Sequence, residues 1–469
     1  MNTKSKVKDL TVGTPWKIVL MFSLPIALSY LLQQAYNLAD MWMIGQFLGE
    51  ASFASVGATA SLNLFVLMFA TGTVTGFSVI TAQRFGKKDI KGMKQSYVSG
   101  TILCFILSIC VMVLAGLFCN PLLMAIGIGP GTDLYQDAFN YIMAIFLGAA
   151  ANIFYNYYSC ILRAIGNNRA PLIFLIISAV INLPLNALFL LPCQLGTLGA
   201  ALGTVIAQFI AAIASFIYIQ YAYPMLRIKK SEFKLSKVEA KVHLKQGLPM
   251  GIQFSILYVA LIILQRVVNN YDKEATAAFS AANKVDALLM QPMLAVGTSM
   301  VSFVGQNYGA KNYARIKKGI KQAFVMQTIL SLVLSGIAFI LKDYVILWLI
   351  KNPSDQTIEY GKITMTFIAI TQIFVGYIFL FRDSLHAAGF PIPAMMSSVA
   401  QATVRIIIAT TFPLFMSFYG AALATPIAWG ASALTLIIFT IIKIFKGFEN
   451  KDYNIKQGPE EENEEPQVE

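Results

Sequence analysis

Twelve mostly apolar stretches, bounded by charged residues, glycine or proline, set the first constraint on how this chain can fold. A helix needs about 20 apolar residues to cross a hydrocarbon core that is roughly 30 Å thick. Unpaired backbone polar groups are not tolerated in lipid, and these stretches are too long and continuous for the alternating strands of a membrane barrel. The sequence therefore predicts an all-α integral membrane protein with twelve transmembrane helices. We place them at residues 16–44, 53–80, 97–119, 134–158, 170–191, 195–221, 244–268, 277–304, 319–341, 357–381, 392–415 and 418–443.

Basic residues lie mainly on one side of these spans. Of the 35 Lys and Arg residues, 28 fall before or at the start of the first span, after the last one, or in the loops that follow even-numbered spans. Cytoplasmic loops retain Lys and Arg preferentially. We therefore expect a multi-pass protein of the plasma membrane with both termini in the cytoplasm. The net charge of +12 follows from this topology, and the dispersal of the basic residues argues against nucleic-acid binding.

Reactive side chains show no arrangement typical of an enzyme. The five cysteines lie in apolar runs or short loops without paired spacing, and the two histidines lack metal-ligand spacing. No phosphate-binding loop or nucleophile motif stands out. We therefore expect no catalytic activity, no metal and no cofactor. We also expect a monomer that is surrounded by membrane lipid.

Four motifs recur at a nearly constant offset of close to half the chain, which indicates that the chain is duplicated. "SLPIALS" returns as "GLPMGIQ", "RFGKKDIKGMKQ" as "NYGAKNYARIKKG", "LRAIGNNRAPL" as "LHAAGFPIPAM", and "LGAALGT" as "YGAALAT". Six spans is an even number, so both halves have the same orientation and are related by a pseudo-two-fold axis along the membrane normal. We expect a cytoplasmic segment at 1–15, six-helix lobes at 16–221 and 244–443, a basic linker at 222–243 and a disordered acidic tail at 444–469.

The motifs resemble those of the multidrug and toxic compound extrusion transporters, the MATE family. The resemblance rests on "YNLADMWMIGQFLG", "LRAIGNNRAP", "LGAALGT" and "VGQNYGAKNYARIKKG", and it covers the chain from about residue 15 to residue 443. It implies a two-lobed, twelve-helix exporter that expels amphipathic, often cationic compounds in exchange for H⁺ or Na⁺. A cavity between the lobes would then bind substrate from alternate sides.

The resemblance also implies a coupling site in the N-terminal lobe. In the DinF-like branch this lobe carries an aspartate, an Asn-x-x-x-Asp pair and a threonine, which correspond to Asp40, Asn182, Asn186 and Thr204. Asn186 departs from the pattern, because an aspartate is usual there, and the departure weakens the expectation of a complete Na⁺ site. The NorM-like branch uses acids in spans seven and ten, where this chain has Gln253 and Gln372. We therefore expect the DinF-like mode.

The positions of polar residues within the predicted spans indicate a polar site independently of the family resemblance. An intramembrane acid such as Asp40 is costly and usually functional, and desolvation favours the protonated form of a carboxyl group. Proton and cation would then compete for it, as an antiporter requires. The alternative is a structural role for Asp40, and packing by hydrogen bonds between helices for the Asn and Thr residues. A polar stripe on the first span and nearby amides supply the candidates for the substrate cavity: Gln33, Tyr36, Asn37, Asn63, Asn152 and Asn156.

The C-terminal lobe carries three intramembrane charges, Lys284, Asp286 and Arg405. Such charges usually pair, and Asp286 is expected to pair with Arg405 rather than with Lys284, which lies only two residues away on the same helix. The network is either a structural clamp or part of a substrate site. Pro25 and Pro184 interrupt helical hydrogen bonding within their spans and are hinge candidates.

The sequence thus predicts a secondary active exporter that exchanges small organic cations for protons. Na⁺ is the alternative coupling ion. Rival functions are a flippase for lipid-linked oligosaccharides, which would need a more cationic cavity, and a channel or passive carrier.

Overall fold

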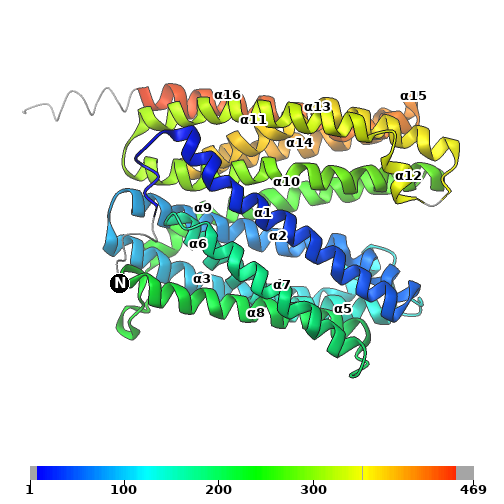
Figure 1. Ribbon diagram of the computed structural model, residues 1–469, viewed down its shortest axis with the longest axis horizontal. Helices are drawn as coiled ribbons and strands as arrows, with labels where there is room; N and C mark the ends of the chain where they lie inside the picture. Colours follow the sequence, from blue (N-terminus) through cyan, green and yellow to red (C-terminus); the bar gives the residue numbers. More distant parts are fainter. Residues whose placement is uncertain (1–7, 351, 450–469) are drawn as a thin grey trace, which may run out of the picture.

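The computed structural model describes residues 8–350 and 352–449, and it consists of helices joined by short loops (Figure 1). Eleven helices in this part of the chain are long and apolar enough to cross a membrane. A bent pair, α5 and α6, supplies the twelfth span. The all-α prediction with twelve spans is therefore confirmed.

The spanning helices are α1 (Pro15–Leu48), α2 (Glu50–Gly86), α3 (Ile90–Leu117), α5 (Tyr135–Leu147) with α6 (Ala149–Ala164), α7 (Arg169–Leu190), α8 (Gly196–Ala222), α9 (Lys237–Val268), α10 (Lys273–Gly309), α11 (Tyr313–Leu341), α13 (Asp355–Ala387), α14 (Pro391–Thr411) and α16 (Phe418–Thr440). Shorter helices are α4 (Cys119–Ala125), α12 (Val345–Leu349), α15 (Pro413–Met416) and the 3₁₀ turns Pro224–Leu226 and Lys230–Glu232. A π-helical segment, Ile441–Lys446, continues α16.

The expected disordered tail at 444–469 falls mostly outside the described residues, which end at Glu449. Its first residues are helical, because the π-helical segment runs through Lys446. Residues 1–7 of the expected cytoplasmic segment also lie outside the described part of the chain. The helical end of the chain is therefore longer than the sequence predicted.

Most observed helices extend past the predicted spans, by up to seven residues, and two of the differences change the local structure. The span expected at 134–158 is broken at Gly148, where α5 and α6 meet at 46°, and it extends to Ala164. A Cβ on Gly148 would lie 2.3 Å from Val205 Cγ2, so the break lies where Val205 of α8 packs directly against the helix. Helix α13 continues to Ala387 instead of ending near residue 381. Arg382 and Asp383 therefore form a buried ion pair inside the helix, at 2.9 Å, and are not in a cytoplasmic loop.

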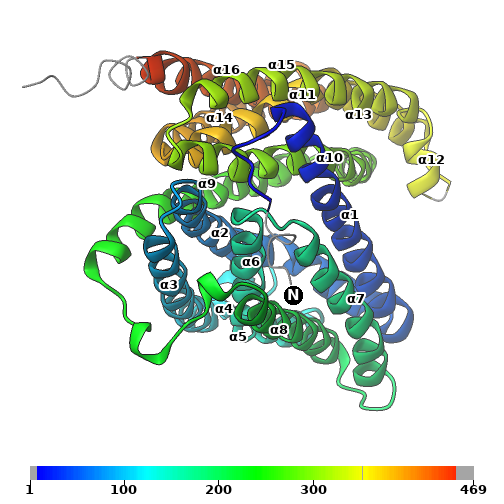
Figure 2. The same ribbon diagram turned by 60° about the vertical axis from the view of Figure 1, so that its left-hand side comes forward.

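The helices form two lobes, which we call the N-lobe (α1–α8) and the C-lobe (α9–α16). Figure 1 shows both described chain ends at one end of the bundle, which we call the terminal end, and Figure 2 turns this end toward the viewer. The lobes join there, with α2 packed on α9 and α1 packed on α10. In Figure 1 their ribbons diverge toward the opposite end.

A symmetric pair of contacts joins the lobes at the terminal end. Gln83 Nε2 donates to the carbonyl oxygen of Ala387 at 2.9 Å, and Gln306 Nε2 donates to that of Ala164 at 2.8 Å. Gln83 and Gln306 occupy equivalent positions in the two halves of the repeat, as do Ala164 and Ala387. The sequence repeat therefore reappears as a pseudo-two-fold contact between the lobes.

Residues 8–14, which we call the N-terminal strap, cross this junction before α1 begins. Leu10 is fully buried, and its N–H donates to Gln306 Oε1 at 2.9 Å. Its carbonyl oxygen accepts from Asn307 Nδ2 at 3.2 Å and from Arg315 Nη2 at 3.3 Å. Gly166, at the end of α6, lies directly against the backbone of Lys8. The strap thus contacts the N-lobe and the C-lobe together.

Candidate functional site

Asp40 on α1 is the centre of a cluster of polar side chains inside the N-lobe. Its Oδ1 accepts a hydrogen bond from Asn186 Nδ2 at 2.8 Å, and its Oδ2 accepts one from Thr204 Oγ1 at 3.3 Å. Asn182 links the other two, because its Nδ2 donates to Thr204 Oγ1 at 3.3 Å and its Oδ1 accepts from Asn186 Nδ2 at 3.2 Å. The structure thus brings together all four predicted coupling residues, from α1, α7 and α8. We call them the N-lobe polar cluster.

Local sequence explains how α7 and α8 present these groups. Asn182 and Asn186 are four residues apart, so they share one buried face of α7, while Pro184 is exposed on another face. A Cβ on Gly203 would lie 1.9 Å from Asn186 Oδ1. Glycine at this position therefore lets α8 approach the cluster closely. Asn186 Oδ1 itself is buried without a hydrogen-bond partner.

The N-lobe polar cluster contains no positive side chain that could balance the charge of an ionised Asp40. The hydrogen-bond partners of Asp40 are the neutral side chains of Asn186 and Thr204. A half-buried carboxylate inside a membrane span is costly when it has no positive partner, so the site favours either a protonated acid or a bound cation. The unused acceptor Asn186 Oδ1 adds another oxygen that can face a cation. The cluster can therefore hold a proton or a positive charge, and each excludes the other.

A small polar cavity adjoins the cluster on the side of α6. It is lined by Gln33 and Tyr36 of α1, Asn152, Tyr155 and Asn156 of α6, Leu175, Ser178 and Ala179 of α7, and Gln208 of α8. Tyr36 is one helical turn from Asp40, so the cavity and the cluster share a wall of α1.

Four of the six predicted cavity residues, Gln33, Tyr36, Asn152 and Asn156, line this cavity. The other two do not: Asn37 is exposed elsewhere on α1, and Asn63 lies on α2 with its side-chain oxygen buried and without a hydrogen-bond partner. Asn37 and Asn63 are close in sequence to other polar residues, but their side chains lie on helix faces that do not line the cavity.

The six predicted cavity residues leave out three polar lining residues, Tyr155, Ser178 and Gln208. A signal for two of them was present. Ser178 is four residues before Asn182, and Gln208 is four residues after Thr204. Extending each polar stripe by one helical turn would therefore have found both.

The charged network of the C-lobe centres on Asp286. Its Oδ1 accepts a hydrogen bond from Gln372 Nε2 at 2.6 Å, and Arg405 is its electrostatic partner. Lys284 is exposed and Arg405 is buried, but in the described part of the chain Asp286 forms no direct ion pair with either of them, so the expected pairing with Arg405 stays a prediction. The sequence did not indicate Gln372 as a partner of Asp286. Gln372 Oε1 and Arg405 Nε are buried without hydrogen-bond partners.

Removing the buried charge of Arg405 is expected to destabilise the C-lobe. Arg405→Gln removes the positive charge that attracts the buried carboxyl group of Asp286, and we expect the free energy of unfolding to fall by about 2 kcal/mol. Thermal unfolding of the purified protein in detergent measures this. The matched control is Arg266→Gln, because Arg266 is exposed on α9. Equal midpoints for the two variants would contradict a stabilising role for the buried charge of Arg405.

The two hinge candidates lie within helices that continue through them. Helix α1 runs from Pro15 to Leu48 past Pro25, and Ser29 Oγ donates to the Pro25 carbonyl oxygen at 2.8 Å. Helix α7 likewise continues past Pro184. Hinge motion at either proline stays a prediction.

Comparison with known proteins identifies the family to which this chain belongs. The MatE family model matches residues 25–188 and again residues 249–411, one match in each half of the chain. The chain belongs to the MatE family. Members of this family are transporters, so the protein is a multi-span membrane transporter and not an enzyme.

Relatives of this MatE transporter include several named for drug export. It is 28% identical over 388 residues to the "Probable multidrug resistance protein YpnP" of Bacillus subtilis, covering 82% of this chain and 85% of that protein. It is 24% identical over 397 residues to the "Multidrug export protein MepA" of Staphylococcus haemolyticus, covering 83% and 85%. Another relative, 24% identical over 398 residues with coverage of 82% and 85%, is the "FAD transporter" of Shewanella oneidensis.

Solved structures share the fold. A multidrug resistance MATE transporter described in an outward-facing conformation matches with a TM-score of 0.87 at 19% identity, over 95% of this chain and 99% of that one. A transporter from Pyrococcus furiosus matches with a TM-score of 0.87 at 20% identity, over 96% and 100%. The predicted arrangement of two six-span lobes is the fold of these proteins.

Proposed function

We propose that this MatE transporter exports amphipathic organic cations in exchange for protons, and that Asp40 is the coupling residue. One observation carries the proposal: Asp40 is held by neutral hydrogen-bond donors beside a polar cavity, so its charge has no partner within the N-lobe polar cluster. A titratable acid with this surrounding has two stable conditions, protonated and empty or ionised and neutralised by a cation.

Exchange follows from this competition. With Asp40 ionised, the N-lobe polar cluster attracts a cationic substrate. The cavity of about 10 Å³ has room for one water-sized group, so it must widen to admit a drug-sized cation, and Tyr36 and Tyr155 then add cation–π attraction. A proton that arrives from the opposite face neutralises Asp40 and releases the substrate. Alternating access of the two lobes then returns the protonated site to the other side. Drug and proton therefore move in opposite directions across the plasma membrane.

The orientation of this cycle rests on the basic loops. With the terminal end in the cytoplasm, as the distribution of Lys and Arg predicts, the lobes are joined on the cytoplasmic side and diverge toward the outside (Figure 1). This arrangement would be the outward-facing state, in which Asp40 exchanges substrate for protons from the exterior.

The coupling ion is proposed to be H⁺, in the DinF-like mode, with Na⁺ as the alternative. One carboxylate and the oxygens of Asn182, Asn186 and Thr204 surround the site. A dehydrated Na⁺ bound there would contact only one ligand with a full negative charge, the carboxylate of Asp40. The interiors of α9 and α13 present Gln253 and Gln372 where the NorM-like mode would use acids. A single acid is sufficient for a proton.

Asn186→Asp is expected to change the coupling ion. Its carboxylate would lie about as close to Asp40 as the present 2.8 Å hydrogen bond. Two carboxylates at this distance repel each other, so the pair either shares one proton and carries a single charge, or ionises fully around a bound cation. We expect the variant to gain stimulation of efflux by a Na⁺ gradient, measured in proteoliposomes with and without Na⁺. Efflux of the variant that remains independent of Na⁺ would contradict the assignment of Asn186 to the ion site.

The experiment that tests the proposed function is ethidium efflux from proteoliposomes under an imposed pH gradient or an imposed Na⁺ gradient. Efflux driven by the pH gradient alone supports the proposal. Efflux driven only by Na⁺ keeps the exporter and changes the ion. If a well-folded preparation moves no organic cation under either gradient, drug export is wrong and lipid-linked sugars are the next substrate class to test.

A further inference from the structure

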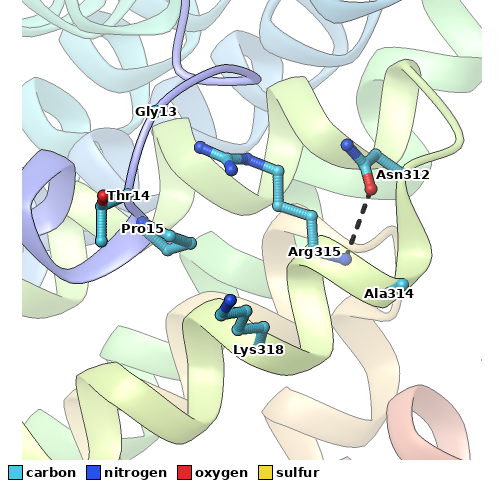
Figure 3. A pocket seen from close by; sticks show the side chains of 7 residues that line it. All are labelled: Gly13, Thr14, Pro15, Asn312, Ala314, Arg315 and Lys318. Atoms are coloured by element: carbon cyan, nitrogen blue, oxygen red, sulfur yellow. Dashed lines mark hydrogen bonds between the residues drawn. The ribbon is translucent and has the colours of Figure 1, made fainter.

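A pocket of about 440 Å³ lies between the N-terminal strap and the start of α11, at the terminal end of the bundle (Figure 3). Its lining residues are Gly13, Thr14, Pro15, Asn312, Ala314, Arg315 and Lys318. Figure 3 shows the side chains of Arg315 and Lys318 on α11 extending toward Thr14 and Pro15. One wall of the pocket therefore leads into the N-lobe through α1, and the other belongs to the C-lobe.

The charged residues of this lining are both cations. Arg315 donates from Nη2 to the Leu10 carbonyl oxygen at 3.3 Å, but its buried Nε has no hydrogen-bond partner. Lys318 is exposed. Asp9 attracts Arg315 from the strap, although its Oδ1 already accepts from the backbone N–H and the hydroxyl of Thr11. The pocket thus keeps positive charge and unused N–H donors.

The start of α1 adds to this positive potential. Thr14 is the N-cap residue of this 34-residue helix, and its side chain makes no capping hydrogen bond. The first turn of a long helix carries a partial positive charge. Asn312, in contrast, caps α11 internally by accepting from the N–H of Arg315 at 3.3 Å. The N–H of Trp16 in this first turn of α1 already donates to Gln322 Oε1 of α11 at 3.1 Å. Helix α1 therefore contributes its partial positive charge, while the two cationic side chains of α11 supply the N–H donors.

The neighbouring residue Trp16 indicates the depth of the pocket in the membrane. It is 42% exposed next to the pocket, and the ammonium of Lys17 lies 5.6 Å from the centre of its ring. Tryptophan and lysine at the end of a span are typical of the interface between water and lipid. The pocket therefore lies at the level of phospholipid headgroups.

We propose that this pocket binds the phosphate group of an anionic phospholipid headgroup. The guanidinium of Arg315 and the ammonium of Lys318 bind phosphate oxygens by charge-assisted hydrogen bonds, and the hydroxyl of Thr14 donates from the opposite wall. A phosphate held in this way connects α1 to α11. It stabilises the conformation in which the lobes are joined at the terminal end. Inorganic phosphate offers the same chemistry, so the test separates the two sources.

The test measures thermal unfolding of the purified full-length protein in a neutral detergent, with added phosphatidylglycerol, phosphatidylcholine or inorganic phosphate. We expect phosphatidylglycerol to raise the unfolding midpoint and phosphatidylcholine to leave it unchanged. The double variant Arg315→Gln/Lys318→Gln should lose this shift. The control Lys229→Gln/Lys230→Gln removes two exposed charges from the linker and should keep it.

Arg315 also holds the strap, so a second variant guards against a purely structural effect. Lys318→Glu leaves the contact between Arg315 and Leu10 in place but reverses the charge at the pocket, and it should weaken the lipid-dependent shift. An equal shift with inorganic phosphate would support a phosphate site that is filled from solution. A shift that the double variant and Lys318→Glu both retain would overturn the proposal. Transport is not measured, so the outcome does not depend on the proposed function.

Discussion

Asp40→Asn is expected to slow efflux driven by a pH gradient about tenfold or more while leaving the protein folded. The amide is nearly the same size as the carboxyl, and its oxygen can still accept from Asn186 Nδ2, so the N-lobe polar cluster can stay assembled. It cannot ionise, so proton and cation no longer compete for one site. We expect the rate to fall about tenfold or more, which corresponds to at least about 1.4 kcal/mol in the rate-limiting barrier. Ethidium efflux from proteoliposomes measures the rate.

A control variant and a second measurement make this expectation specific to Asp40. The control is Asp133→Asn, which neutralises an exposed acid in the loop before α5 and should transport at the parent rate. Substrate affinity should also change its pH dependence. In the parent, deprotonation of Asp40 strengthens binding of a cation as pH rises, whereas binding to Asp40→Asn should not follow pH through this group. Parent-like efflux by a well-folded Asp40→Asn protein would remove Asp40 from the mechanism.

The second large effect is expected at the two glycines that let the lobes meet. A Cβ on Gly86 of α2 would lie 1.8 Å from the carbonyl oxygen of Gln306, and a Cβ on Gly309 of α10 would lie 1.7 Å from that of Gln83. Backbone atoms cannot rotate away as side chains do, so Gly86→Ala or Gly309→Ala must move the helices apart at the terminal end. A cost of about 1.4 kcal/mol is enough to lower the population of the joined state tenfold. We expect both variants to lose transport by about tenfold or more.

The control for this prediction is Gly336→Ala, because Gly336 lies within α11 and a Cβ there would meet no atom within 4 Å. Gly86 and Gly309 are equivalent positions of the repeat and make mirrored contacts, so the two variants should fail to a similar degree. Alkylation of a cysteine placed at Thr75, between the joined ends and the middle of α2, should become faster from the terminal side in both. Unchanged transport and unchanged labelling would show that the tight approach is not needed for the cycle.

Much of the architecture could be predicted because the lipid bilayer restricts it. Length, hydropathy and the distribution of basic residues are one-dimensional quantities, and a span must satisfy its own backbone hydrogen bonds. The repeat of the four motifs then predicted two lobes. The break between α5 and α6 at Gly148 escaped prediction because it depends on how closely α8 approaches, and no local sequence signal encodes that distance.

Some features of the candidate site could likewise be predicted from the sequence, whereas others depend on the packing of the helices. Asp40 was identifiable as a costly intramembrane acid, and Asn182 and Asn186 as a pair on one helical face. That α8 brings Thr204 to the same carboxylate, while Asn37 and Asn63 lie elsewhere, depends on the rotation of each helix about its axis. This rotation is set by packing between helices.

The sequence by itself determined the membrane class, the twelve spans, the duplication and the residues whose burial demands a partner. Only the tertiary structure decided which partners they have. Gln372 is bonded to Asp286, and Arg382 pairs with Asp383 inside α13. The approach of α2 and α10 at Gly86 and Gly309 likewise joins segments from opposite halves of the chain. The physical reason is that hydrophobicity places each helix in the membrane independently, whereas a polar contact requires two helices to match in depth, rotation and distance.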